Sequence, residues 1–257
     1  MTYQPFDLSG RVALVTGGNA GIGLGIARAV AEAGADVAIW GTSAARNAAA
    51  RDDLARTGRR VLALECDVGD EDAVERAFAE TVRALGRVDG CFANAGIYPG
   101  ARTPFVEMTA ESWRRVMRVN LDGAFYTLRA AARHMVERGD GGSLVGTASL
   151  AAIEGAARSE HYAATKGGLV SMIRALAVEL ARYGVRANAL LPGWIETGMT
   201  EAAIGDERFR ASVLPRIPAR RWGTGADFGG IAVYLMSDAS SYHTGDSLVI
   251  DGGYSLY

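Results

Sequence analysis

Short apolar runs alternate along the chain with longer segments of helical period. The runs at 12–16, 37–40 and 61–64 have the length of strands and are rich in Val, Ala, Leu and Ile. Between them, apolar residues recur every three or four positions, as at Ile22 and Ile26. This repeated change of period predicts successive strand–helix–strand units.

The alternation continues through the second half of the chain. Further strands are predicted at 88–93, 143–147, 185–191 and 247–250. Helices are predicted at 21–34, from after the strand at 37–40 to about residue 57, and at 71–85, 110–137, 162–183 and 226–236. Right-handed crossovers between parallel strands place the connecting helices on both sides of the sheet. The predicted fold class is therefore α/β, a Rossmann-type doubly wound, seven-stranded parallel sheet with helices on both faces.

One segment breaks this rhythm. Residues 194–224 contain prolines and scattered charges in place of a clear period. Ligands of open α/β sheets bind outside the carboxyl ends of the strands. Because this segment follows the sixth predicted strand, we predict that it forms a substrate lid. No linker, repeat or low-complexity stretch divides the chain, so residues 1–257 are predicted to form a single domain.

Composition narrows the possible classes of function. Of the 257 residues, 49% are hydrophobic and 22% are charged, which provides enough apolar material for one large core. The net charge of −2 argues against a nucleic-acid partner, which requires a basic face. No apolar run has the length of a membrane span and no signal-peptide pattern is visible, so a cytoplasmic protein is expected. Cys66 and Cys91 lack metal-ligand spacing, so no metal site is expected.

A glycine-rich stretch follows the first predicted strand and opens the first predicted helix. Residues 16–23 read Thr-Gly-Gly-Asn-Ala-Gly-Ile-Gly. Glycines let the backbone turn tightly and expose N–H groups to an anion, and the helix N-terminus adds a favourable dipole. An ordinary glycine turn is the alternative, but the strand before and the helix after favour a pyrophosphate cradle. The candidate cofactor residues here are Gly17, Asn19, Gly21, Ile22 and Gly23.

The end of the second predicted strand bears on the choice of nucleotide. An acidic residue usually stands there and holds the ribose 2′-hydroxyl, but this chain has Gly41. Without a carboxylate to repel a 2′-phosphate, and with Thr42, Ser43 and Arg46 close by to bind one, NADP(H) is slightly favoured over NAD(H). A carboxylate introduced at Gly41 is expected to shift the preference toward NAD.

Two further strand ends carry candidate cofactor contacts. Asp67 and Val68 end the third predicted strand, where the carboxylate can accept a hydrogen bond from the adenine amino group. The alternative is that Asp67 belongs to the N-cap region of the helix beginning at Glu71. Small residues after the fourth strand let a cofactor lie against the backbone, and these are Asn94, Ala95 and Gly96.

Four polar residues are candidates for catalysis. Tyr162 and Lys166 are one helical turn apart and share a helix face. A nearby ammonium stabilises phenolate, so Lys166 is expected to lower the pKa of Tyr162. Ser149, just past the fifth strand, can orient a substrate oxygen. Asn120 is locally unfavourable inside a long predicted helix and can hold a water that links Lys166 to solvent. Taken singly, each of the four is better explained as an ordinary surface or structural residue.

Taken together, these features resemble the short-chain dehydrogenase/reductase family, in its shorter single-domain branch, over essentially the whole chain. The family's glycine motif is met by residues 16–23, its Asn-Ala-Gly by residues 94–96 and its late Asp-Gly-Gly by residues 251–253. The resemblance gives catalytic roles to Asn120, Ser149, Tyr162 and Lys166, the last two also contacting the cofactor. It adds the cofactor residues Pro192, Gly193, Ile195 and Thr197.

The resemblance implies an NAD(P)(H)-dependent oxidoreductase that interconverts a secondary alcohol and a ketone or other carbonyl by hydride transfer. Tyr162 would act as general acid and base, Ser149 would steady the substrate oxygen, and Lys166 with Asn120 would relay the proton. A non-catalytic nucleotide-binding sensor on the same fold is the alternative, and the complete catalytic set argues against it. The expected partners are a small-molecule alcohol or ketone and further copies of the chain, in a homotetramer or homodimer.

Two loops and the lid are expected to line the substrate pocket. They are residues 97–99, residues 150–158 and His161, with Trp194 at the start of the lid. Tyr98 and Trp194 predict a partly apolar wall. The fold itself does not fix the substrate, because specificity in such folds is determined by the loops.

Overall fold

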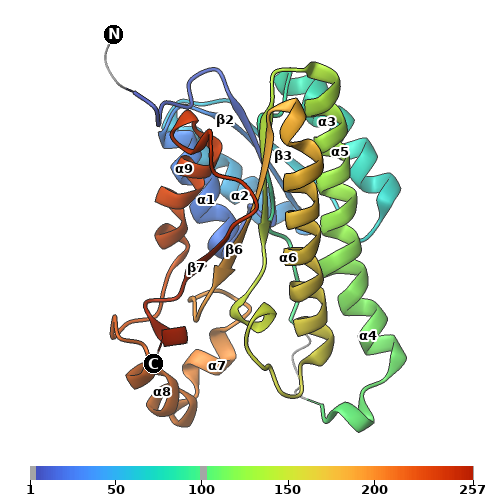
Figure 1. The fold of residues 1–257 in the computed structure, drawn as a ribbon. Helices are drawn as coiled ribbons and strands as arrows, with labels where there is room; N and C mark the ends of the chain where they lie inside the picture. The colour runs from blue at the N-terminus through green and yellow to red at the C-terminus, as the bar shows by residue number, and fades with distance from the viewer. Residues whose placement is uncertain (1–3, 99–102, 257) are drawn as a thin grey trace.

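A computed structural model describes residues 4–98 and 103–256, which form one sheet and the helices around it (Figure 1). The strands are β1 (Val12–Thr16), β2 (Asp36–Gly41), β3 (Val61–Glu65), β4 (Gly90–Ala93), β5 (Gly142–Thr147), β6 (Val185–Pro192) and β7 (Ser247–Ile250). The α-helices are α1 (Gly21–Glu32), α2 (Ala44–Leu54), α3 (Glu71–Leu85), α4 (Ala110–Met117), α5 (Gly123–Arg138), α6 (Glu160–Leu180), α7 (Glu201–Gly205), α8 (Glu207–Val213) and α9 (Gly229–Met236).

The sheet has the doubly wound order β3-β2-β1-β4-β5-β6-β7, and every neighbouring pair of strands is parallel. The chain therefore winds outward in one direction through β2 and β3, and in the other from β4 to β7. The direction reverses between β1 and β4, and the carboxyl ends of these two strands border the crevice where such folds bind ligands. The predicted Rossmann-type α/β fold is confirmed.

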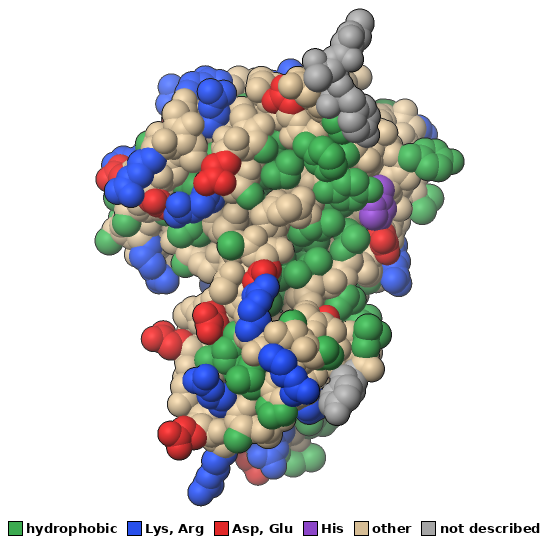
Figure 2. Space-filling view, turned by 90° about the vertical axis from the view of Figure 1, so that its left-hand side faces the viewer, with side chains coloured by type: hydrophobic (Ala, Val, Ile, Leu, Met, Phe, Trp, Pro, Cys, Tyr) green, Lys and Arg blue, Asp and Glu red, His purple; other side chains and the backbone are tan. Residues whose placement is uncertain are grey.

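Alternate residues of the strands build two separate cores. In β1, Val12 and Leu14 belong to a core shared with α3, α5 and α6, whereas Ala13 and Val15 belong to one shared with α1 and α9. Figure 1 shows these two groups of helices on opposite sides of the sheet. Figure 2 shows the face of α1 and α9, where hydrophobic side chains gather in the upper part and charged side chains dot the lower part around α7 and α8.

Local signals fix several helix boundaries. Asp70 caps α3 by accepting a hydrogen bond from the Ala73 N–H at 3.1 Å, and the helix ends at Gly86, whose φ is +90°. The predicted bounds 71–85 are confirmed. The continuous helix predicted at 110–137 is wrong in its middle, because α4 and α5 are separated by a π-helical turn, Arg118–Asp122.

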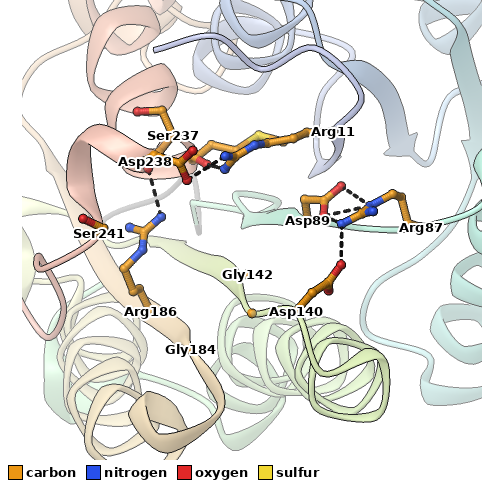
Figure 3. Close-up of a pocket in the computed structure, with 12 residues that line it drawn as sticks. Arg11, Arg87, Asp89, Asp140, Gly142, Gly184, Arg186, Ser237, Asp238 and Ser241 are labelled. Atoms are coloured by element: carbon orange, nitrogen blue, oxygen red, sulfur yellow. Dashed lines mark hydrogen bonds and ion pairs between the residues drawn. The ribbon is translucent and has the colours of Figure 1, made fainter. Parts of the chain in front are cut away.

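A cavity in the described structure lies at the amino ends of the strands, away from the predicted site. Its volume is about 270 Å³, and arginines and aspartates line it (Figure 3). Figure 3 shows Arg11, Arg186 and Asp238 on one side, and Arg87, Asp89 and Asp140 on the other. These charges are engaged with protein groups, so this cavity is an ion-paired structural feature and carries no part of the predicted chemistry.

Asp89 is the buried member of that network, at 7% exposure. It accepts hydrogen bonds from the Val12 N–H at 2.8 Å and from Arg87 Nε at 2.9 Å, and it pairs with Arg138 at 3.1 Å. Removal of one partner of a buried pair leaves charge and an N–H unsatisfied. Asp89→Ala is therefore expected to lower the free energy of unfolding by about 3 kcal/mol, as measured by urea denaturation.

Asp140→Ala is the matched control for that experiment. Asp140 contacts the same arginines, Arg87 and Arg138, but its side chain is 48% exposed. An exposed ion pair contributes less than about 1 kcal/mol. Equal losses of stability in the two variants would contradict the assignment of Asp89 as the residue that organises the network.

Candidate active site

The glycine-rich loop forms a cradle at the carboxyl end of β1. Gly17 and Gly21 have φ values of +63° and +52°, and a Cβ on Gly23 would lie 2.3 Å from the carbonyl oxygen of Gly17. Ala20 stands at the N-cap of α1 and makes no side-chain capping hydrogen bond. The first N–H groups of α1 thus face outward without a capping side chain, which fits a bound pyrophosphate.

The end of β4 is tied directly to this cradle. The Thr16 hydroxyl accepts hydrogen bonds from the N–H groups of Asn94 and Ala95, both at 3.0 Å. Asn94 Nδ2 donates in turn to the Thr16 carbonyl oxygen at 2.9 Å. These bonds place residues 94–96 beside the glycine loop, so the two segments predicted to contact the cofactor are neighbours.

The residues predicted to meet the adenosine end lie after β2 and β3. Thr42 is exposed, and Ser43 caps α2 by accepting from the Arg46 N–H at 3.4 Å. Asp67 accepts from the Gly69 N–H at 2.9 Å and pairs with Arg118 at 2.9 Å. The N-cap of α3 itself is Asp70, and the Asp67 carbonyl oxygen accepts a hydrogen bond from the Asp70 N–H at 3.1 Å. The N-cap-region role of Asp67 therefore stays open, and its adenine contact stays a prediction.

Val68, also predicted to bind cofactor, is buried at 6% exposure. Its side chain packs on α5, where a Cβ on Gly123 would lie 2.7 Å from Val68 Cγ2. Ile22 is half-buried and packs against the core of α1 and α9. The side chains of these two residues therefore contribute to packing, and their contact with a cofactor stays a prediction.

Ser149, Tyr162 and Lys166 come together at the carboxyl end of β5. Ser149 follows this strand and is hydrogen-bonded to Tyr162, which lies in the first turn of α6. Lys166 Nζ lies 5.5 Å from the centre of the Tyr162 ring and donates to the Thr147 carbonyl oxygen at 2.7 Å. Three of the four predicted catalytic residues thus form one polar group at the predicted edge of the sheet.

The pKa values in this group differ from expectation. Burial raises the pKa of Tyr162 to about 12, opposed by the Ser149 hydrogen bond and assisted by Tyr98. Burial also lowers the pKa of Lys166 to about 8. The prediction that Lys166 lowers the pKa of Tyr162 is wrong for this structure, because desolvation dominates both groups and the ammonium is directed at Thr147.

Asn120 occupies the π-helical turn between α4 and α5 and is buried at 1% exposure. Its Oδ1 accepts from the Ile97 N–H at 2.7 Å and its Nδ2 donates to the Ile97 carbonyl oxygen at 2.9 Å. A Cβ on Gly96 would lie 3.3 Å from Asn120 Oδ1 and 3.6 Å from Lys166 Nζ. Asn120 therefore lies near Lys166 and holds the loop after β4, while the water that it is predicted to hold stays a prediction.

Tyr98 has a position that the sequence did not reveal. Its hydroxyl is 2.7 Å from that of Ser159, and its ring meets the ring of Tyr162 edge to face at 5.2 Å between centroids. From the sequence, Tyr98 is expected only to form part of an apolar wall, since neither partner is close to it along the chain. Pro99, predicted to line the same pocket, lies outside the described residues, and His161 is buried at 2% exposure.

The predicted lid is more ordered than its sequence indicates, since residues 194–224 contain α7 and α8. Its two ends are joined by a bridge between Ile195 and Gly223. Within it, Phe209 stacks on Trp222 at 6.3 Å, and Trp194 meets Phe209 edge to face at 4.9 Å. These aromatic contacts explain why the segment is compact despite its irregular pattern.

The start of the predicted lid lies against the glycine loop. A Cβ on Gly21 would lie 2.9 Å from Thr197 Cγ2, and Ile195 is buried at 4% exposure. Just before them, Pro192 ends β6, and the N–H of Gly193 donates to the Ile250 carbonyl oxygen at 3.0 Å. The four cofactor residues predicted at the end of β6 and just after it thus lie between β6 and the cradle.

Comparison with known proteins agrees with this arrangement. The family model described as enoyl-(acyl carrier protein) reductase matches residues 17–255. The chain is 34% identical to 2-dehydro-3-deoxy-D-gluconate 5-dehydrogenase of Escherichia coli over 99% of both chains. It is 38% identical to L-rhamnose 1-dehydrogenase (NAD(P)(+)) of Azotobacter vinelandii over 95% of this chain and 96% of that one.

A solved structure extends the comparison to three dimensions. Gluconate 5-dehydrogenase from Burkholderia cenocepacia, in complex with NADP and tartrate, is 35% identical and has a TM-score of 0.93. The match covers 99% of this chain and 98% of that one. The chain belongs to the short-chain dehydrogenase/reductase family. It is an NAD(P)-dependent oxidoreductase that acts on CH–OH groups, as the sequence predicted.

Proposed function

We propose that Tyr162 exchanges a proton with the substrate oxygen while hydride moves between the substrate carbon and the nicotinamide. The observation that carries this proposal is the convergence of Ser149, Tyr162 and Lys166 beside the glycine cradle. Ser149 steadies the substrate oxygen, and Lys166 holds charge next to the phenol. Asn120 holds the loop after β4 by accepting a hydrogen bond from the Ile97 N–H. In this proposal it also completes the proton path from Lys166.

The cradle fits a dinucleotide on its own geometry. The uncapped N-terminus of α1 supplies N–H donors, and at Gly23 a side chain would fill the space next to Gly17. When bound, the nicotinamide supplies the hydride acceptor or donor. Gly17, Asn19, Gly21, Asn94, Ala95 and Gly96 line the phosphate side in this proposal, and Pro192, Gly193, Ile195 and Thr197 the nicotinamide side.

NADP(H) is the slightly preferred cofactor in this proposal. Gly41 places no carboxylate at the end of β2, and exposed Thr42 and the N-terminus of α2 offer polar and dipole contacts to a 2′-phosphate. The related structure from Burkholderia cenocepacia contains NADP. Titration with NADPH and NADH, followed by nicotinamide fluorescence, measures the two dissociation constants, and the one for NADPH is expected to be the lower.

We propose a sugar or sugar acid as the substrate. The relatives named above act on gluconates and on L-rhamnose, and they match this chain over nearly its full length. Around the reacting position the chain offers hydroxyl groups from Ser149, Tyr162 and Tyr98, which suit a polyhydroxylated molecule. Trp194, which packs on Phe209, forms the apolar wall on the lid side of the pocket in this proposal.

A comparison of substrates tests this class. With NADP⁺ or NAD⁺ as oxidant, D-gluconate, 2-dehydro-3-deoxy-D-gluconate and L-rhamnose are assayed beside cyclohexanol, an apolar secondary alcohol with the same number of carbon atoms. At least one of the three sugars or sugar acids is expected to give a kcat/KM about tenfold or more above that of cyclohexanol, since a missing hydroxyl leaves polar groups of the site unpaired. A higher kcat/KM for cyclohexanol than for all three would exclude sugars and sugar acids as the substrate class, while alcohol oxidation would still be supported.

The proposal also covers the cellular location of the protein and its oligomeric state. We place the protein in the cytoplasm, where free thiols such as Cys66 and Cys91 persist. Among the described helices, none combines the length and apolar content that a membrane span needs. Exposed apolar side chains on α5, α6 and β7, Phe125 at 42%, Val178 at 84% and Val249 at 38%, support a homotetramer or homodimer.

A further inference from the structure

Two amide side chains form a hydrogen-bonded pair at the end of β2 that the catalytic chemistry does not use. Asn47, in α2, is buried at 3% exposure. Its Nδ2 donates to the carbonyl oxygens of Gly41 at 2.9 Å and Leu64 at 3.0 Å. Because two acceptors fix the NH₂ end of this amide, its Oδ1 must be the acceptor for Asn19 Nδ2, at 2.7 Å.

This pairing determines how Asn19 is presented. With its NH₂ group engaged by Asn47, Asn19 turns its Oδ1 elsewhere, and that oxygen has no hydrogen-bond partner within residues 4–98 and 103–256. Asn19 is half-buried in the glycine loop, directly before the N-terminus of α1. An oriented, neutral acceptor thus stands at the edge of the cofactor cradle.

The same pair explains why Gly41 has no side chain. A Cβ on Gly41 would lie 2.3 Å from Asn19 Nδ2 and 2.7 Å from Asn47 Oδ1. Asn47 cannot move aside cheaply, since it is bound to two carbonyl oxygens. The amide of Asn19 therefore occupies the space where the side chain of an acid at the end of β2 would begin.

We propose that Asn19, positioned by Asn47, replaces the acid that usually binds the adenosine ribose. Its Oδ1 accepts a hydrogen bond from the ribose 2′-hydroxyl of NAD(H). Because the amide is uncharged, it does not repel the 2′-phosphate of NADP(H). Asn19 is the contacting residue and Asn47 is a positioning residue. The inference rests on the proposed cofactor site, and it assigns the tolerance for both cofactors to this pair.

Asn19→Asp is the decisive variant, because it adds charge with almost no change in size. The dissociation constants of NADH and NADPH are measured by nicotinamide fluorescence, with thermal unfolding as the check on folding. NADPH is expected to bind about tenfold or more weakly, since a carboxylate repels the 2′-phosphate. NADH is expected to weaken no more than in Asn19→Ala, because the variant loses the hydrogen bond to Asn47 Oδ1 but keeps an acceptor for the ribose hydroxyl. Asn19→Ala is expected to weaken NADH about three- to tenfold, the scale of one lost hydrogen bond.

The positioning role of Asn47 is tested by a double-mutant cycle. Asn47→Ala is expected to weaken NADH as much as Asn19→Ala does, and the double variant no more than the worse single one, because both act through one hydrogen bond. Asp52→Ala, on the exposed side of α2, is the control and is expected to bind like the wild type. If Asn47→Ala does not fold, the two Asn19 variants decide the question alone.

Gly41→Asp separates this inference from the simpler expectation drawn from the sequence. That substitution is expected to weaken NADH and NADPH alike, because its Cβ displaces the amide pair, and not to shift the preference toward NAD. A folded Gly41→Asp protein that prefers NAD overturns the inference. Equal changes for NADH and NADPH in Asn19→Asp overturn it as well. A wild-type chain that binds neither cofactor overturns the proposed cofactor site itself.

Discussion

Replacement of Tyr162 by Phe is expected to lower turnover by about 10²-fold or more, with the dissociation constant of the cofactor nearly unchanged. The variant keeps the ring that packs against Tyr98 and beneath Lys166, and it removes only the hydroxyl bound by Ser149. The proton donor is lost while the fold around it stays. Steady-state kinetics and fluorescence titration of the same preparation separate the two effects.

Tyr183→Phe is the matched control, since Tyr183 is 37% exposed beyond the end of α6 and is expected to have wild-type turnover. Near wild-type turnover in Tyr162→Phe would remove the phenol from the mechanism.

The raised pKa of Tyr162 also predicts a direction dependence. With a pKa of about 12, the phenol is protonated at neutral pH and ready to donate to a carbonyl oxygen. Oxidation of an alcohol instead needs the phenolate as base. The rate of alcohol oxidation is therefore expected to rise as the pH increases above neutral, while carbonyl reduction does not rise with it.

The parts of the structure that the sequence predicted well are those fixed by near neighbours. The bounds of α3 depend on Asp70 and Gly86, which cap its two ends. The glycine loop depends on a strand before it and a helix after it, both readable from their periods. In each case the determining contacts span a few residues, so the pattern along the chain contains them.

The parts that the sequence did not predict depend on distant contacts. The π-helical turn surrounds Asn120, whose partners are the backbone atoms of Ile97, 23 residues away. The need for a glycine at position 41 comes from the side chains of Asn19 and Asn47, which are 28 residues apart. The pKa of Tyr162 depends on how deeply the assembled site is buried. None of these arrangements leaves a local signal in the sequence.

Lys166 is the only lysine in the chain, so every other cationic side chain apart from histidine is an arginine. An arginine stays charged at any ordinary pH, whereas a buried lysine can lose its proton. Burial lowers the pKa of Lys166 from 10.5 to about 8. Lys166→Met is expected to reduce turnover by about 10²-fold or more, because it removes the group that holds charge beside Tyr162.

The same substitution is expected to change how stability depends on pH. Between about pH 8 and 10.5 the unfolded chain keeps the Lys166 proton and the folded chain has released it, so the wild-type free energy of unfolding gains from this residue as the pH rises. One pKa unit corresponds to about 1.4 kcal/mol, which puts the gain at about 3 kcal/mol over that window. Lys166→Met lacks it, and other titrating groups cancel in the difference between the two proteins.

Urea denaturation of both proteins across that pH window measures this difference. Because the chain has one lysine, a ¹⁵N label at Nζ gives a single side-chain signal whose titration reports the pKa directly. A midpoint near 8 is expected in the folded protein. A midpoint near the ordinary lysine value, together with parallel stability profiles for wild type and Lys166→Met, would show that the ammonium is not desolvated. The Lys166 ammonium would then have to be in contact with solvent in the folded protein.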